Sequence, residues 1–267
     1  MNDFKVQNII HLQNNIFSRS FVGQNLITLS EVDSTNTYLK NILSNSKPVE
    51  GTVIMAESQY AGRGQQQNKW HSEPSKNLSF SILLTPGFLP VANQFDLTRV
   101  VSLGVYDALK PLLGDGLKIK WPNDVYYHGG KLGGILIENI LQGHKIKHSV
   151  IGIGLNINQT DFPEWVPNPT SVKQILQRDE DLKVILLDIC SHIERWYLKL
   201  KDDDVEEIRQ AYISILYWLN QRQQFRSNGE IFEGTIKNVR ENGLLVVKNN
   251  LNTELEFNFK QIEFINK

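Results

Sequence analysis

The chain has 267 residues, 40% of them hydrophobic and 21% charged, which is the composition of a globular protein and excludes a disordered one. Its formal net charge of -1 excludes a general basic surface for nucleic acid. Its one cysteine, Cys190, excludes an intramolecular disulfide and argues against a structural zinc site. With no signal-peptide pattern and no apolar run near the ~20 residues that span a bilayer, we expect a cytoplasmic protein that binds no membrane.

Residues 26–160 predict short strands with two helices between them. Residues 26–33 alternate apolar and polar side chains, as a half-buried strand does. Ser34, Thr35 and Asn36 then offer capping side chains for a short helix. The predicted elements are helices at 36–44 and 93–110 and strands at 26–33, 52–57, 77–85, 117–121, 124–127, 132–139 and 147–155.

Two segments between these elements lack any periodic pattern. Residues 58–77 are rich in Gly, Gln, Asn and Ser, and a loop of this length is usually functional or disordered. Residues 159–170 carry three prolines and are also predicted to be loop. Two further helices are predicted at 180–199 and 203–219, where Leu, Ile and Val recur at spacings of three and four.

The pattern changes at 220–224, and the rest of the chain holds short β-rich runs separated by the hairpin-type sequences ENG and NNLN. We therefore predict two domains, 1–220 and 221–267, the second leaning on the first because it is near the size limit for independent folding. The predicted fold class is α+β: a mixed β-sheet with helices on one side, followed by a small β domain.

The long loop contains Gly62-Arg63-Gly64, followed by Lys69 and Trp70. The glycines permit close approach of the backbone to a ligand, and the guanidinium of Arg63 suits a carboxylate or a phosphate. The indole of Trp70 offers a flat face for stacking, for example on an adenine. Taken alone, Gly-Arg-Gly is more often a surface turn with a solvated arginine.

A second motif is Lys120-Trp121-Pro122-Asn123-Asp124, with Lys131 a few residues later. Asn123 and Asp124 lie at a predicted turn between strands, where short polar side chains aim locally. Lys131 begins a strongly apolar strand, where its ammonium can neutralise charge that develops on a carboxylate or phosphate. The alternatives are an ordinary turn and a solvated strand end.

A third motif places Gly152 and Gly154 inside a predicted strand. Glycine there is typical of close approach by a ligand, and the alternative is close approach by a neighbouring segment. The motif does not open a helix, so it does not predict a dinucleotide-binding fold. The sequence also lacks a GxxxxGK[ST] phosphate loop, a GxSxG elbow and an HExxH metal motif, so it carries no common sequence signature of a phosphate-binding, hydrolase or zinc-protease site.

In their order and wording these motifs resemble those of the biotin–protein ligase family. The matching stretches are 33–36, 56–64 through Trp70, 120–124, 131–136 and 152–156, and the resemblance covers about residues 26–160. It implies a catalytic domain of the class shared with lipoate ligases and class II synthetases, with an SH3-like β-barrel after it. It also implies activation of biotin with ATP to biotinyl-5′-AMP, release of pyrophosphate, and transfer of biotin to one lysine of a biotin carboxyl carrier protein or domain.

The resemblance also implies roles for single residues. Catalytic roles fall to Arg63, Lys131 and Asp124, with Asp124 the candidate to orient or deprotonate the carrier amine. A bound Mg²⁺ would help to screen the repulsion between biotin carboxylate and phosphate, and its ligands stay open. The implied biotin-binding residues are Ser34, Thr35, Asn36, Gln59, Gly62, Arg63, Lys131, Gly152 and Gly154, and the implied nucleotide-binding residues are Gly64, Gln65, Lys69, Trp70, Asn123 and Asn156.

The chain departs from the arginine-rich form of the family loop. Gln65, Gln66 and Asn68 stand where several members carry arginine, and Gln67 replaces a frequent glycine. Fewer loop charges should weaken retention of the adenylate or increase the dependence on Mg²⁺.

Several alternatives stay open. A repressor role is not expected, because residues 1–25 are too few for a helix-turn-helix domain and Lys5 and Arg19 are the basic residues before Lys40. A lipoate–protein ligase or acyltransferase, or an inactive binding protein on the same fold, are the rival functions. The strands at 77–85 and 147–155 could each form the edge of a homodimer.

Overall fold

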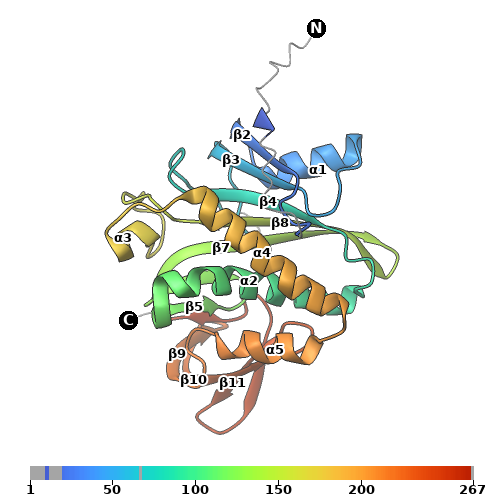
Figure 1. Ribbon diagram of the computed structural model, residues 1–267. Coiled ribbons are helices and arrows are strands. Elements are labelled where there is room, and N and C mark those ends of the chain that lie inside the picture. Colours follow the sequence, from blue (N-terminus) through green and yellow to red (C-terminus); the bar gives the residue numbers. More distant parts are fainter. Residues whose placement is uncertain (1–9, 12–19, 66–67, 266–267) are drawn as a thin grey trace.

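Two β-sheets and a layer of helices organise the chain (Figure 1). The computed structural model describes residues 10–11, 20–65 and 68–265. Across these residues, every helix is too short or too polar to serve as a membrane span.

The large sheet has eight strands in the order β1-β2-β3-β4-β8-β7-β6-β5. Strands β2 and β3 run parallel and the other neighbours are antiparallel, so the predicted mixed sheet is confirmed. All seven strands predicted before residue 160 are present. With the short strand β1, which was not predicted, the bounds are β1 (Ile10–His11), β2 (Leu26–Val32), β3 (Val53–Gln59), β4 (Leu78–Leu84), β5 (Leu117–Lys120), β6 (Asp124–Tyr127), β7 (Gly130–Gln142) and β8 (Lys145–Leu155).

Helices cover both faces of the large sheet, unequally (Figure 1). On one face lie α2 (Phe95–Leu113), α4 (Leu182–Lys201) and α5 (Val205–Ser214), and the predicted helical layer is therefore confirmed for these three. Helix α1 (Thr35–Asn45) is the exception, since it packs on the opposite face. Alternation along β3 explains the two layers: Val53 belongs to the core under α2 and α4, and Ile54 to the small core under α1.

The main core lies between the large sheet and α2, which α4 crosses closely. A Cβ on Gly104 would come within 2.5 Å of Ile193 Cγ1, so glycine is what permits this approach of the two helices. Cys190 of α4 is buried in the same core, as predicted, and burial raises the pKa of its thiol to about 12. The thiol is therefore a packing group rather than a nucleophile.

The predicted helix at 203–219 ends early, at Ser214. The backbone of the next residues pairs with the edge strand β5 instead: Ile119 N donates to Ile215 O and Tyr217 N donates to Ile119 O. The edge of the sheet thus competes with the helix for these hydrogen bonds. Three short helical elements were not predicted: η2 (Val91–Asn93), η3 (Gly114–Gly116) and α3 (Val172–Leu176).

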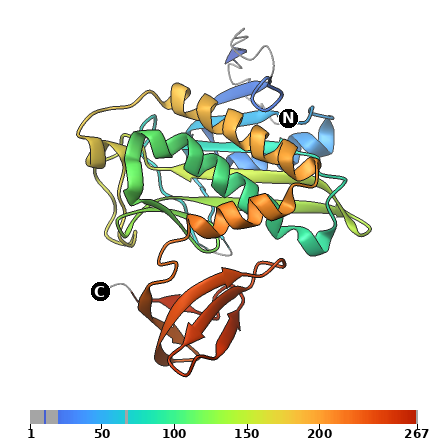
Figure 2. The ribbon, with the colours of Figure 1, turned by 60° about the horizontal axis from the view of Figure 1, so that its bottom comes forward.

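The C-terminal sheet forms a layer of its own against the helices and the edge of the large sheet (Figure 2). It is antiparallel in the order β12-β11-β10-β9-β13, and both predicted hairpins are present. Strand β9 was missed because its residues are mostly polar and only Phe225 is fully buried. Division of the chain into domains 1–220 and 221–267 stays a prediction. The strand bounds are β9 (Arg222–Ser227), β10 (Glu230–Val239), β11 (Leu245–Asn249), β12 (Glu254–Phe257) and β13 (Glu263–Phe264).

Candidate active site

A cavity of about 830 Å³ lies on the face of the large sheet that carries α1. Its walls come from the start of α1, the loop that begins at Arg63, strands β7 and β8, and the segment 120–124. Residues 259–264, next to β13 of the C-terminal sheet, complete the wall. We call the end beside α1 the near end, and the end between 120–124 and 259–264 the far end.

Small polar side chains build the near end. The amide of Thr35 donates to Gln59 Oε1 over 2.8 Å, and the Ser81 hydroxyl lies 2.7 Å from Thr35 Oγ1 and 2.6 Å from Asn36 Oδ1. Ser34 is the N-cap of α1, but its side chain makes no capping hydrogen bond, which differs from the predicted capping role. Ser34, Thr35 and Asn36 are buried and line the cavity, Gln59 lines it as well, and Ser81 lies buried behind them.

The two strand glycines make room for side chains as well as for the cavity. A Cβ on Gly152 would lie 2.5 Å from Asn36 Oδ1, and a Cβ on Gly154 would lie 2.5 Å from Trp70 Cε2. The indole of Trp70 is fixed there by its Nε1, which donates to Ser79 Oγ over 3.2 Å. Close approach of neighbouring side chains, the alternative interpretation of this motif, is therefore observed, and both glycines line the cavity.

The Gly62–Trp70 loop is closed at its base like a hairpin. The Trp70 amide donates to Gly62 O over 3.0 Å, and the Gly64 amide donates to Asn68 O over 2.7 Å. Gln66 and Gln67 lie outside the described residues. This base holds Arg63 above β7.

In this structure Arg63 pairs with a carboxylate that the sequence did not single out. Its Nη2 lies 3.0 Å from Glu138 Oε2, and Lys40 Nζ lies 2.8 Å from Glu138 Oε1. Asn36 Nδ2 also donates to Glu138, over 2.8 Å. Burial acts to raise the pKa of Glu138, but the hydrogen bonds from Lys40 and Asn36 and the Arg63 charge outweigh it, and the pKa lies below its usual value.

Lys131 and Asp124 form an ion pair in the wall of the cavity, with Nζ 2.7 Å from Oδ1. The pairing of β6 with β7 shifts by one residue, so that Val125 faces Gly133 but Tyr126 faces Lys131. Since alternate residues of a strand share a face, this shift puts Lys131 on the same face as Asp124. Both side chains are partly exposed and line the cavity.

The segment 168–170 runs beside Lys131 and fixes its backbone. The Lys131 amide donates to Asn168 O over 2.7 Å, and the Thr170 amide donates to Lys131 O over 2.9 Å. Asn156 supports this arrangement, because its Nδ2 donates to Thr170 O over 3.1 Å.

The far end is built where the two sheets meet. Lys120 Nζ lies 3.2 Å from the Tyr126 hydroxyl and over two rings, 4.7 Å from the centroid of Tyr126 and 5.0 Å from that of Phe264. Burial lowers the pKa of Lys120, with Asp124 opposing and Lys131 adding to the shift. Trp121 stands beside Phe259, with ring centroids 5.3 Å apart, and its peptide bond to Pro122 is cis.

The cavity gathers most of the predicted site residues, which are Ser34, Thr35, Asn36, Gln59, Arg63, Gly64, Gln65, Lys69, Trp70, Asn123, Asp124, Lys131, Gly152 and Gly154. Gly62 and Asn156 are not among the lining residues: Gly62 belongs to the base of the loop, and Asn156 lies behind Lys131. Sequence reasoning missed Glu138 and Lys40, and it missed 259–264, which carry no recognisable motif. The ligand roles of all these residues stay predictions.

Comparison with known proteins finds a family and solved structures to which this chain is similar. The model of the biotin/lipoate A/B protein ligase family matches residues 29–156. The solved structure of the biotin protein ligase from Aquifex aeolicus in complex with biotin and ATP has 29% sequence identity and a TM-score of 0.76, and the match covers 91% of this chain and 100% of that one. Over residues 29–156 the chain is therefore similar to this family, and over most of its length it is similar in fold to a biotin protein ligase.

Curated proteins are similar to this chain over most of its length. The biotin--[acetyl-CoA-carboxylase] ligase of Paracoccus denitrificans is 29% identical, and the match covers 82% of this chain and 92% of that protein. The bifunctional ligase/repressor BirA of Bacillus subtilis is 28% identical, with 86% of this chain and 71% of that protein covered. The matched residues 29–156 hold every predicted site residue, whereas the cavity residues 259–264 lie beyond them.

Proposed function

We propose that this chain is a biotin–protein ligase, which activates biotin with ATP and then transfers it to a lysine of a carrier protein. The observation that carries the proposal is the Lys131–Asp124 pair, at 2.7 Å, in the wall of a cavity that is also lined by the loop and strand motifs. The near end offers many hydrogen-bonding groups for the ureido ring of biotin. Phe80, Leu136 and Ile153 supply apolar walls for the rest of the molecule.

The first step joins two anions and therefore needs positive charge. A biotin carboxylate oxygen attacks the α-phosphorus of ATP, the bond to the bridging oxygen breaks, and pyrophosphate leaves. Arg63 and Lys131 both line the cavity, and each is paired with a carboxylate. We propose that substrate anions replace Glu138 and Asp124 as partners, so that no unpaired charge exists before binding.

The nucleotide is proposed to occupy the centre and the far end. Trp70 offers a ring for adenine, and Lys69 and Asn123 line the same space. Mg²⁺ fits this site, because it is commonly held by one or two carboxylates together with phosphates. Among the described residues that line the cavity, Asp124 and Glu263 supply those carboxylates, and the ion would neutralise phosphate charge.

The second step transfers biotin to the carrier. The neutral lysine amine attacks the carbonyl carbon of the mixed anhydride, the bond from this carbon to the phosphate oxygen breaks, and AMP leaves. The amine must lose a proton, and we propose that Asp124 accepts it once Lys131 has turned to the phosphate. The carrier is a biotin carboxyl carrier protein or domain.

The test is biotin-dependent exchange of labelled pyrophosphate into ATP, with lipoate and octanoate in parallel. We expect exchange with biotin alone, and a loss of about 10²- to 10³-fold in Lys131→Ala because a charge-stabilising group is removed. Lys173→Ala is the control, since Lys173 forms a surface ion pair with Asp179. Exchange driven by lipoate would assign the sister activity, and binding of biotin without exchange would demote the chain to a binding protein.

Three further predictions are proposals of the same kind. Absence of DNA binding rests on the net charge of -1, and binding that weakens steeply with salt would contradict it. Lys5 and Arg19 lie outside the described residues. Cytoplasmic location and a homodimer are to be tested by fractionation and by sedimentation. The expectation that the strands at 77–85 and 147–155 form a dimer edge is wrong, because β4 and β8 pair with each other inside the large sheet and neither lies at its edge.

A further inference from the structure

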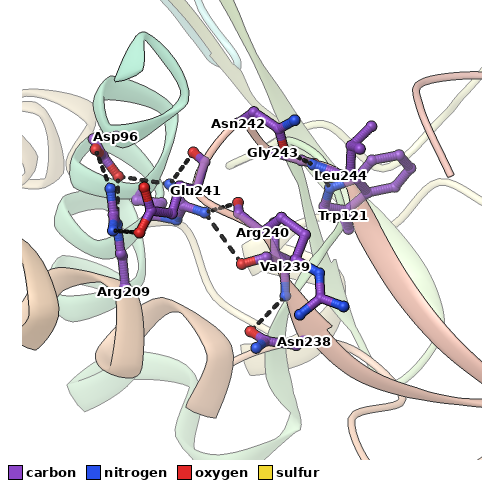
Figure 3. Close-up of polar contacts among 11 residues, drawn as sticks. Asp96, Trp121, Arg209, Asn238, Val239, Arg240, Glu241, Asn242, Gly243 and Leu244 are labelled. Atoms are coloured by element: carbon purple, nitrogen blue, oxygen red, sulfur yellow. Dashed lines mark hydrogen bonds and ion pairs between the residues drawn. The ribbon is translucent and has the colours of Figure 1, made fainter. Parts of the chain in front are cut away.

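A buried cluster of charges joins the two sheets outside the cavity (Figure 3). Asp96 and Arg99 lie in the first turns of α2, their side chains are fully buried, and Arg99 Nη1 is 2.6 Å from Asp96 Oδ1. Arg209 of α5 bridges outward, with one nitrogen 3.3 Å from Asp96 Oδ2 and another 2.8 Å from Glu241 Oε1. Glu241 belongs to the turn between β10 and β11, so the cluster ties α2 and α5 to the C-terminal sheet.

Arg99 binds the backbone of this turn as well as Asp96. Its Nη2 donates to Arg240 O over 2.6 Å and to Val239 O over 3.3 Å, and its Nη1 donates to Glu241 O over 3.1 Å. Three consecutive carbonyl groups thus converge on one planar guanidinium. A lysine could keep the ion pair with Asp96, but its single ammonium cannot reproduce this fork.

The turn 239–244, which Arg99 binds, also contacts the wall of the cavity. Gly243 O accepts a hydrogen bond of 3.0 Å from Trp121 Nε1 (Figure 3). Gly243 has a φ of +93°, and a Cβ there would lie 2.5 Å from Cδ2 of Phe95, the ring on which Arg99 rests at 4.6 Å. Trp121 is 5% exposed and lines the far end of the cavity.

A second contact reaches the same segment from the helical layer. The Tyr212 hydroxyl of α5 donates to Pro122 O over 2.9 Å, and the Tyr212 ring packs edge-on against Phe95 at 5.9 Å. The segment Trp121–Pro122 is therefore fixed from two sides by groups that also contact the charged cluster. Its position depends on how the C-terminal turn is seated.

Stability alone is a weak reason for such a cluster. Burial lowers the pKa of Arg99, and its Nε has no hydrogen-bond partner among the described residues. Buried ion pairs often add little to stability compared with apolar residues of the same size, and a role in fixing geometry is the better-attested use.

We propose that Arg99 is a positioning residue of the ligase: it seats the turn 239–244, and through the Gly243 carbonyl it sets Trp121 and the far wall of the nucleotide site. The C-terminal sheet then affects adenylation in two ways: through the contact of the turn 239–244 with Trp121, and through residues 259–264 of the cavity wall. This inference rests on the proposed function, because it assigns the far end to ATP.

The test uses the full chain with Arg99→Lys and Trp121→Phe, and with Arg195→Lys as control, since Arg195 forms an exposed pair with Asp107. Hydrogen exchange should speed up in Arg99→Lys at both 239–244 and 121–124. The KM for ATP in pyrophosphate exchange should rise about ten- to hundred-fold in Arg99→Lys, because small displacements of positioning groups have effects of this size. The Kd for biotin should stay within about two-fold, because the near end is built separately.

Trp121→Phe removes the bond to Gly243 without touching the charged cluster, so it tests the link even if Arg99→Lys folds poorly. We expect a similar rise in the KM for ATP, and no further rise in the double variant, because both changes break one path. Faster exchange at 239–244 with an unchanged KM for ATP would overturn the proposal, and so would multiplying effects in the double variant. A wild type without biotin-dependent exchange would refute the function, while coupled hydrogen exchange at 239–244 and 121–124 would still support the mechanical link.

Discussion

The two ends of the cavity are built in different ways. At the near end, Thr35, Gln59 and Ser81 come from α1, β3 and β4, which pack directly against one another. At the far end, Trp121 is held by a carbonyl 122 residues away in sequence, at Gly243. The near end is therefore a property of one sheet and its helix, and the far end exists only when the C-terminal sheet is docked.

This difference suits the two ends to different ligands. A preformed pocket of small polar groups suits recognition of one compact ligand, because little has to be ordered on binding. A wall shared by two sheets can be adjusted through its docking contacts, as the Arg99 cluster illustrates. Variants at one end should thus leave the other end's ligand largely unaffected.

A large effect is expected at the near end, from Gly152→Ala. The new Cβ would lie 2.5 Å from Asn36 Oδ1, and Asn36 cannot yield easily because Ser81 and Glu138 hold it. Overpacking costs roughly 1–3 kcal/mol, which corresponds to about ten- to hundred-fold weaker biotin binding by calorimetry. Gly87→Ala is the matched control, since no atom lies within 4 Å of its added Cβ. A comparable loss of ATP affinity would break the distinction between the ends.

The next effect is expected at the far end, from Lys120→Met. Lys120 lines the cavity on the rings of Tyr126 and Phe264, where it can donate to a phosphate. Loss of a charged hydrogen bond costs roughly 1.5–3 kcal/mol, so the KM for ATP should rise by about ten-fold or more. Lys118→Met on the same strand is the control. An unchanged KM for ATP, or weaker biotin binding alone, would count against a nucleotide at this end.

A smaller effect is expected in the loop that joins the two ends. Gln65 lines the cavity, and Gln65→Arg restores a charge that the arginine-rich form of this loop carries. A partly exposed charge contributes roughly 0.2–1 kcal/mol, so release of biotinyl-5′-AMP should slow by about two- to five-fold in stopped-flow measurements. Gln210→Arg on α5 is the control. Wild-type release as slow as in arginine-loop relatives would refute the hypothesis of weaker retention.

The smallest effect concerns the stability of the near end and its pH dependence. Because the pKa of Glu138 is lowered in the folded chain, its contribution is present above the unfolded pKa and is lost as the pH falls through the folded one. Glu138→Gln should flatten this acid loss by less than about 1 kcal/mol, since the pair is partly solvated. Thermal unfolding from neutral pH down to acid, with Glu57→Gln as control, measures it. If stability falls with pH in Glu138→Gln as steeply as in the wild type, the loss of stability in acid is due to other carboxylates.

Local patterns predicted most of the architecture. Alternation in residues 26–33 and 147–155 placed β2 and β8, and Asn-Gly and Asn-rich turns placed the C-terminal hairpins. Sequence periodicity predicted the wrong element where the backbone forms hydrogen bonds with a segment distant in sequence. Residues 215–217 look helical, but they pair with the edge of β5. Strand β9 is polar because most of its side chains face solvent.

The sequence by itself determined the loop and strand motifs of the cavity and their chemical types, because these are encoded in short runs such as 120–124 and 62–70. The tertiary structure alone decided that Lys131 shares a face with Asp124, through a one-residue shift between β6 and β7. It also decided that Arg63 is held by Glu138 and that Trp121 is held by the C-terminal turn. The reason is physical: side-chain periodicity reports which face of its own element a residue occupies, and it carries no information on which distant backbone or charge will meet that face.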